Sequence, residues 1–179
     1  TIDVLDSLNI MHTGTFKDVK NREKNNLLVF SKDGIKVGLL NYTYGTNGLS
    51  FSDPVYVNLV DSVLIRKDVK SAKNKDLDKL VVFVHWGYEY RDFPNSYQKK
   101  YNRFFQDLGV DVVIGSHPHV IQQMEYGKKN NQEFLTVFSL GNFVSNQREE
   151  RKDGGAMIRL SFKKSYNNIL ISRKEYIPV

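Results

Sequence analysis

The chain has 179 residues, of which 40% are apolar and 12% are Phe, Trp or Tyr, and its formal charge is +6. This composition can form one packed domain and excludes a disordered chain. There is no cysteine, which excludes disulfides and thiolate metal sites, and no apolar run approaches the ~20 residues of a membrane-spanning helix. The positive charge can attract a polyanion, but no basic run is interleaved with aromatic residues, so we expect a solvated lysine surface and no nucleic-acid partner.

The first part of the chain predicts a helix, a hairpin and a second helix. Residues 1–8 have the apolar spacing of an amphipathic helix. Because a domain seldom begins inside a helix, we expect an N-terminal part of the domain to precede Thr1. Residues 27–30 and 35–42 predict two strands joined by a turn with Asp-Gly, a hairpin signal. Residues 55–57 predict a short strand, and Asp61 or Ser62 can cap a helix that ends near Lys75.

The middle of the chain predicts a strand, a helix and a second strand. Residues 80–84 and 110–114 are largely apolar runs, typical of parallel strands that are buried on both faces. Between them, residues 94–96 (Pro-Asn-Ser) open a helix that Gly109 ends. Its predicted apolar stripe is Tyr97, Tyr101, Phe104, Phe105 and Leu108. This order predicts a right-handed βαβ crossover between parallel strands.

The last part of the chain is rich in predicted strands, which are residues 121–126, 134–139, 156–162 and 169–176. Residues 127–132 predict a polar turn, and residues 146–153 predict a charged loop. The whole pattern predicts the α/β fold class and a single domain over residues 1–179.

Three histidines are predicted to meet at one edge of the sheet. His85 and His117 each follow the C-terminal end of a buried strand, the edge at which α/β sheets bind ligands. Pro118 disfavours helical geometry at His117, and in an extended segment residues i and i+2 point the same way, so His119 should point with His117. Three or four ligands with imidazole nitrogen at ~2.0–2.1 Å suit a divalent metal. We therefore predict His85, His117 and His119 as metal ligands; the alternative is hydrogen-bonded structural histidines, as we expect for His12.

Other polar side chains follow the same strand ends. Glu89 and Asp92 can accept the second N–H of a ligating imidazole. Asn41 and Asn142 can bind a metal, orient water or hold substrate oxygens, or they can simply stabilise turns. Tyr88, with the tyrosines at 42, 44 and 90, can form a substrate wall or pack with its hydroxyl in water. No P-loop, Gly-x-Ser-x-Gly or Gly-x-Gly-x-x-Gly motif is present.

Five segments together resemble the bacterial capsule-synthesis CapA family, of the poly-γ-glutamate synthesis type. They are residues 85–90 (His-Trp-Gly-Tyr-Glu-Tyr), 115–120 (Gly-Ser-His-Pro-His-Val), 139–143 (Ser-Leu-Gly-Asn-Phe), 41–48 and 12–15. The similarity runs in the same order over nearly the whole chain. That family is related to the calcineurin-like metallophosphoesterases.

The resemblance implies the C-terminal portion of a four-layer αββα sandwich with mixed sheets around a two-metal centre. His85 matches the superfamily's single-His motif, and His117 and His119 match its Gly-His-x-His motif, with Ser116 at the start of the pattern. The earlier Asp-x-His, Gly-Asp and Asn-His motifs are not in this chain. Because two neighbouring metals need ligands from both halves, we expect the site to be incomplete here and the chain to be inactive alone.

The implied function is synthesis, export or anchoring of an anionic cell-surface polymer such as poly-γ-glutamate. The resemblance implies other membrane capsule-synthesis proteins as partners, and a place on the extracellular face of the membrane, with an anchor in the missing N-terminal segment. One or two divalent ions (Mn, Fe or Zn) would be the cofactors. In a metal-dependent hydrolase, the candidate catalytic residues are His85 and Glu89, and the candidate substrate-binding residues are Asn41, Tyr88 and Asn142. The alternative is a non-catalytic scaffold that binds polyanion.

Overall fold

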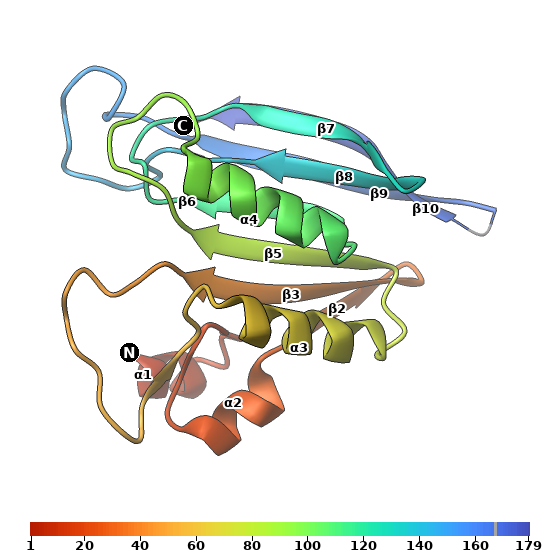
Figure 1. Ribbon diagram of the computed structural model, residues 1–179, viewed down its shortest axis with the longest axis horizontal. Helices are drawn as coiled ribbons and strands as arrows, with labels where there is room; N and C mark the ends of the chain where they lie inside the picture. The colour runs from red at the N-terminus through yellow and green to blue at the C-terminus, as the bar shows by residue number, and fades with distance from the viewer. Residues whose placement is uncertain (167) are drawn as a thin grey trace. The chain divides into compact units, whose positions relative to one another are not determined.

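The computed structural model describes residues 1–166 and 168–179, which divide into two compact units, Thr1–Phe83 and Val84–Val179 (Figure 1). The boundary falls inside strand β5 (Lys79–His85), whose last two residues belong to the second unit. Among the described residues, no helix combines the length and the apolar character that crossing a membrane requires.

The first unit contains short helices and a β-hairpin. Its helices are α1 (Ile2–Ser7), α2 (Val19–Asn25) and α3 (Ser62–Lys73). Its strands before β5 are β1 (Thr15–Phe16), β2 (Leu28–Lys32), β3 (Ile35–Thr43) and β4 (Tyr56–Val57). The strand order is β2-β3-β5, with β2 antiparallel to β3, and β1 pairs separately with β4. The predicted cap of α3 is confirmed, because the Asp61 carboxylate accepts a hydrogen bond from the Leu64 N–H.

Buried polar side chains join α2, β3 and α3 in the first unit. The Arg22 guanidinium donates from Nε to Asn58 Oδ1 at 2.7 Å and from Nη2 to Asp68 Oδ2 at 2.5 Å. The Tyr42 hydroxyl donates to the same Asp68 oxygen at 2.9 Å, and burial, together with the Asp68 charge, raises the pKa of Tyr42. Buried charges are tolerated when they are paired and hydrogen-bonded, so this network determines how the three elements pack.

The second unit contains one long helix and two groups of strands. They are α4 (Ser96–Asp107), β6 (Val112–Ser116), β7 (Met124–Lys129), β8 (Gln132–Val137), β9 (Ala156–Ser165) and β10 (Asn168–Pro178). From the end of β5 the strand order is β5-β6-β8-β7, and this sheet is mixed because β6 is parallel and β7 antiparallel to β8. β9 and β10 form a separate antiparallel hairpin.

The strands of the second unit are covered on both faces. Figure 1 shows α4 in front of the sheet and the β9–β10 hairpin behind it. On β8, Thr136 donates to Asn102 of α4 at 2.6 Å, whereas Glu133 accepts from the backbone N–H of Ile171 in β10 at 3.2 Å. Residues an odd number apart on a strand point to opposite faces. These two contacts therefore place α4 on one face of the sheet and the β9–β10 hairpin on the other.

Two tight turns close the hairpins of the sheet strands. The β2–β3 turn contains only Asp33 and Gly34, with φ of 51° and 74°, as expected for the Asp-Gly signal. The prediction of a polar turn over residues 127–132 is wrong, because β7 and β8 extend into that range and the turn contains only Asn130 and Asn131. Their φ values of 50° and 63° lie in the left-handed region, which Asn tolerates better than most residues.

Helix α4 begins as predicted, but its buried face is more polar than predicted. Asn95 caps its N-terminus in a capping box with Gln98. The residues of α4 that are buried are Gln98, Asn102 and Phe105, and the other residues of the predicted stripe are only partly buried. Two amides can be buried because Gln98 donates to Gln122 at 2.8 Å and Asn102 accepts from Thr136.

Trp86 anchors the strand ends of the second unit. The side chain is fully buried, and its Nε1 donates to the backbone oxygen of Phe138 at 3.0 Å. The indole stacks on the Phe138 ring at 5.9 Å and lies 6.3 Å from the Phe105 ring. A Cβ at Gly115 would lie 2.1 Å from Phe138 O and 2.4 Å from Trp86 Nε1. Only glycine therefore allows β6 to approach the indole this closely.

We expect Arg22→Met to lower the free energy of unfolding by about 3–5 kcal/mol, because it leaves the Asp68 carboxylate buried without its partner. Urea unfolding followed by circular dichroism would measure the change. Lys36→Met removes an ion pair between exposed Lys36 and Asp76 and should have little effect. Equal losses in the two variants would contradict the assigned role of the buried pair.

Candidate metal site

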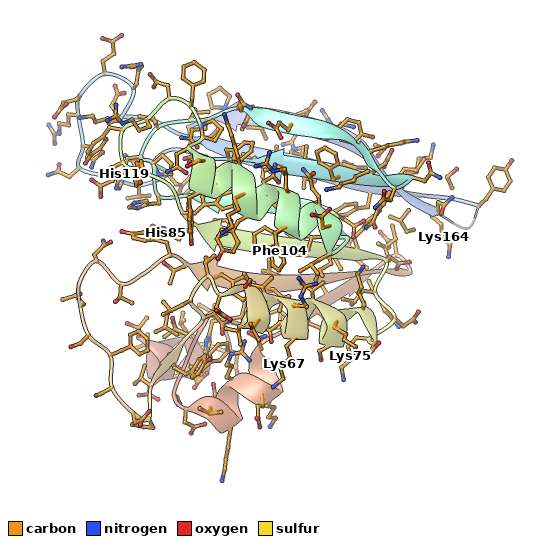
Figure 2. The ribbon with its side chains drawn as sticks, viewed as in Figure 1. Lys67, Lys75, His85, Phe104, His119 and Lys164 are labelled. Carbon is orange, nitrogen blue, oxygen red and sulfur yellow. The ribbon has the colours of Figure 1, made fainter. Side chains whose placement is uncertain are left out.

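The structure brings the three predicted histidines together in the second unit. His85 ends β5, and His117 and His119 follow β6, whose last residue, Ser116, accepts a backbone hydrogen bond from the Trp86 N–H at 3.0 Å. The ring centroids of His85 and His117 are 4.5 Å apart, and those of His117 and His119 are 6.1 Å apart. Figure 2 shows His85 and His119 at the same end of the strands. The three imidazoles therefore form one cluster.

The backbone that brings His117 and His119 together differs from the prediction. The expected extended geometry around Pro118 is wrong, because φ is 102° at His117 and 59° at His119. Their ring planes are inclined to each other by 55°. A side chain in this region of φ costs on the order of 1–3 kcal/mol, and such residues concentrate at functional sites.

Glu89 completes a set of potential metal ligands with two of the histidines. Ligand atoms of Glu89, His117 and His119 all lie within 4.8 Å of one another. The loop that carries Glu89 is held in place by a hydrogen bond from the Tyr90 N–H to Pro118 O at 2.8 Å. Two imidazoles and one carboxylate suit Zn, Mn or Fe ions. These residues therefore fit a divalent cation, and His85 lies beside them.

The environment of His85 and His117 favours their neutral forms. Burial, followed by the neighbouring His117 and His119, lowers the pKa of His85 to about 4, against a smaller opposing effect of Glu89. Burial also lowers the pKa of His117, and the charge of Glu89 partly opposes that shift. A neutral imidazole has a free nitrogen lone pair, which a metal ligand requires.

The amide of Asn142 contacts the histidine cluster directly. Its Oδ1 lies 2.8 Å from His119 Nδ1, and its Nδ2 donates to Lys152 O and to Gln147 Oε1. Its predicted role in substrate binding remains a prediction. Tyr90 stacks on His119 with ring centroids 5.7 Å apart. Gln147 was not predicted, because nothing local in the charged loop distinguishes it from its neighbours.

The remaining predicted residues lie in different surroundings. Asn41 belongs to the first unit, where its Nδ2 donates to Thr13 O at 3.2 Å. Asp92 accepts from Arg151 at 2.7 Å, and the Tyr88 side chain is 66% exposed. His12 Nε2 lies 3.0 Å from Asp6 Oδ1 in the first unit. The substrate-binding roles of Asn41 and Tyr88 and the catalytic roles of His85 and Glu89 remain predictions.

Solved structures with a similar fold define the fold class. NAD nucleotidase from Haemophilus influenzae matches 98% of this chain and 32% of its own, with TM-score 0.61 and 15% identity. The 5′-nucleotidase precursor from Thermus thermophilus matches 99% of this chain and 35% of its own, with TM-score 0.61 and 16% identity. The calcineurin-like phosphoesterase YfkN from Bacillus subtilis matches 93% of this chain and 54% of its own, with TM-score 0.51 and 12% identity. At such identities the likeness concerns the fold alone, and it confirms the predicted α/β, metallophosphoesterase-like fold class, with one mixed sheet among the described residues.

The family is shown by the sequence relatives. Residues 1–147 match the family described as bacterial capsule synthesis protein PGA_cap, and the chain belongs to it. Capsule biosynthesis protein CapA from Bacillus anthracis is 29% identical over 160 residues, which are 87% of this chain and 37% of that protein. PGA biosynthesis protein CapA from Bacillus subtilis (strain 168) is 36% identical over 95 residues, which are 53% of this chain and 24% of that protein. The chain therefore spans little more than a third of these relatives at most, and the predicted resemblance to the CapA family is confirmed.

We expect metal-free protein to lose stability as the pH falls from about 6.5 to about 4, and His85→Gln to reduce that loss. The pKa of His85 is about 4 in the folded protein against 6.5 ordinarily, so the unfolded chain binds more protons in this window. The stabilising contribution of neutral His85 is fully present above pH 6.5 and is lost as the pH falls through about 4. Thermal unfolding with chelator, measured across this window, would test it. Identical slopes in both proteins would contradict the assignment.

Proposed function

We propose that this chain carries part of a metal-dependent hydrolytic site that acts in the biosynthesis of an anionic capsule polymer. The grouping of Glu89, His117 and His119 within 4.8 Å, in a phosphoesterase-like fold, is the observation that supports it most directly. A bound divalent ion would supply Lewis acidity and a water of lowered pKa. We propose that any ligands for a second ion come from outside this chain, as the resemblance to two-metal phosphoesterases implies.

The chain's own residues would divide the work between holding the metal ion and contacting the substrate. Glu89, His117 and His119 would hold the ion, with His85 beside them as a further ligand. The lowered pKa of His85 favours this ligand role over donation of a proton to the leaving group at neutral pH. Tyr88, 66% exposed in the Glu89 loop, would then contact the substrate.

Family membership also supports a proposal about place and partners. We propose that the protein works at the extracellular face of the cell membrane, anchored by a segment outside this chain, together with other membrane capsule-synthesis proteins. The polymer would be a polyanion such as poly-γ-glutamate. The bond that is hydrolysed would be a phosphoester or an amide of that polymer or of its precursors.

In the full-length protein, we expect His117→Ala and Glu89→Gln to lower divalent-metal affinity and hydrolysis of a chromogenic phosphodiester together. The loss of affinity on removing a ligand should be larger than the ~10–100-fold loss that removal of an outer hydrogen-bond partner causes. Elemental analysis and a metal titration would measure it. His12→Ala, which alters a histidine of the first unit, is the control. Metal content unchanged by His117→Ala would refute the metal site.

A second candidate function, non-catalytic polyanion binding, is favoured by a basic hollow in the first unit. The hollow lies among α2, α3 and the β2–β3 hairpin, and its lining includes Arg22, Lys24, Lys67 and Lys75, with Glu23 and Asp68. Asp68 is already paired with Arg22. Among residues 1–166 and 168–179, none of the three lysines forms an ion pair within 4.0 Å. The net positive lining suits carboxylates of an anionic chain.

The positions of two lysines allow a sharp test of the hollow. Lys67 lies on α3 and Lys75 lies two residues beyond the end of α3 at Lys73, and both line the hollow (Figure 2). We expect Lys67→Glu with Lys75→Glu to raise the Kd for poly-γ-glutamate on the order of 10-fold, because each exposed pair contributes ~0.2–1 kcal/mol. Lys70→Glu with Lys73→Glu changes the charge equally elsewhere on α3 and should have less effect. Equal effects of the two double variants, measured by calorimetry at low salt, would exclude a localised site.

A further inference from the structure

We propose that Asn142, supported by Gln147 and Tyr90, is a positioning residue that holds the His119 ring with Nε2 available to a metal ion. The inference rests on the proposed metal site. It assigns to Asn142 a role that acts through His119 and leaves the substrate to other groups.

The hydrogen bonds of the Asn142 amide determine the tautomer of His119. Asn142 Nδ2 donates to Lys152 O at 2.8 Å and to Gln147 Oε1 at 3.1 Å, which uses both of its hydrogens. The amide oxygen therefore faces the ring, and His119 Nδ1 must donate to it across 2.8 Å. A neutral imidazole carries one N–H, so Nε2 of His119 retains its lone pair. Outer partners of this kind orient ligating histidines in metal sites.

A second set of contacts fixes the plane of the same ring. Tyr90 stacks on His119 at 5.7 Å with an interplanar angle of 26°. The Tyr90 hydroxyl accepts from Gln147 Nε2 at 3.1 Å, and Lys152 Nζ lies 4.1 Å from the Tyr90 ring centroid. The contacts thus run in a closed circuit from His119 through Asn142, Gln147 and Tyr90 back to His119. Rotation of the imidazole would break the hydrogen bond and the stacking together.

The backbone of Asn142 is itself held in place. Its N–H donates to Gly154 O at 3.2 Å, and Gly141 bridges to Gly155. A Cβ at Gly155 would lie 2.2 Å from Asn142 O, so the two segments approach as closely as glycine allows. A substrate oxygen would have to displace Lys152 or Gln147 to reach the amide. These contacts favour positioning over substrate binding.

Two measurements on the full-length protein test the proposal. The first is the tautomer of His119 in metal-free protein, read by nitrogen-15 NMR of labelled histidine and assigned by loss of its signals in His119→Gln. The second is the Kd for Zn²⁺ in a calorimetric competition titration. We expect wild type to show the Nδ1–H tautomer. Asn142→Leu should populate the other tautomer and raise the Kd ~10–100-fold.

Three further variants separate positioning from a general loss of structure. Asn142→Asp keeps the acceptor for Nδ1–H and should retain both the tautomer and the affinity. Gln147→Leu leaves the His119–Asn142 bond and should raise the Kd less than Asn142→Leu. Asn146→Ala alters an exposed residue of the same loop and should match wild type.

The proposal is overturned if Asn142→Leu keeps the wild-type tautomer, or if Asn142→Asp fails to restore it. If Asn142→Leu does not fold, Asn142→Asp still decides, because loss of the Nδ1–H tautomer in that variant overturns the proposal. The tautomer is read without metal or substrate, so absence of metal binding or hydrolysis in wild type would refute the proposed function and leave this inference to the NMR result alone.

Discussion

The fully buried indole of Trp86 is the constraint on which the histidine cluster depends. Trp86 directly follows His85, and it joins β5 to the end of β8 through Phe138 and to β6 through the close approach of Gly115. Interiors are packed too densely for an indole to shift without disturbing its neighbours. The strand ends that carry His85 and His117 are therefore held in one arrangement before any ligand is present.

Electrostatics then opposes the arrangement that packing imposes. His85 and His117 cannot both take up protons at low cost in this partly buried place, and their lowered pKa values express that penalty. The left-handed backbone of His117 adds strain. Both costs fall at the place where a cation would be bound. The histidine nitrogens that carry no proton keep a lone pair, and a bound cation would be stabilised by those lone pairs. In the metal-free protein, packing elsewhere in the unit must offset the backbone strain, and it must offset the protonation penalty only as the pH falls below about 6.5.

Features that depend on short stretches of sequence were predictable, and features that depend on distant partners were not. Asp61 and Asn95 mark the starts of α3 and α4 because a cap is a local interaction. The meeting of His85 with His117 followed from strands that end at a common edge. The burial of Asn102 required its partner Thr136, 34 residues away. Gln147 reaches Tyr90 across 57 residues, and no periodicity reports such a contact.

The loop that carries Tyr90 and Asp92 and the loop that follows Asn142 are joined by contacts that differ in how much they stabilise the structure. Arg151 pairs with Asp92 at the surface, and exposed ion pairs contribute about 0–1 kcal/mol at most. The amide contacts of Asn142 are half-buried, and each of them leaves an unsatisfied polar group if it is broken. Asn142 also lies at the base of its loop, where Gly155 packs against it. The orientation of His119 therefore depends on the amide and the stacked Tyr90, whereas the charge of Arg151 can vary without moving the ring.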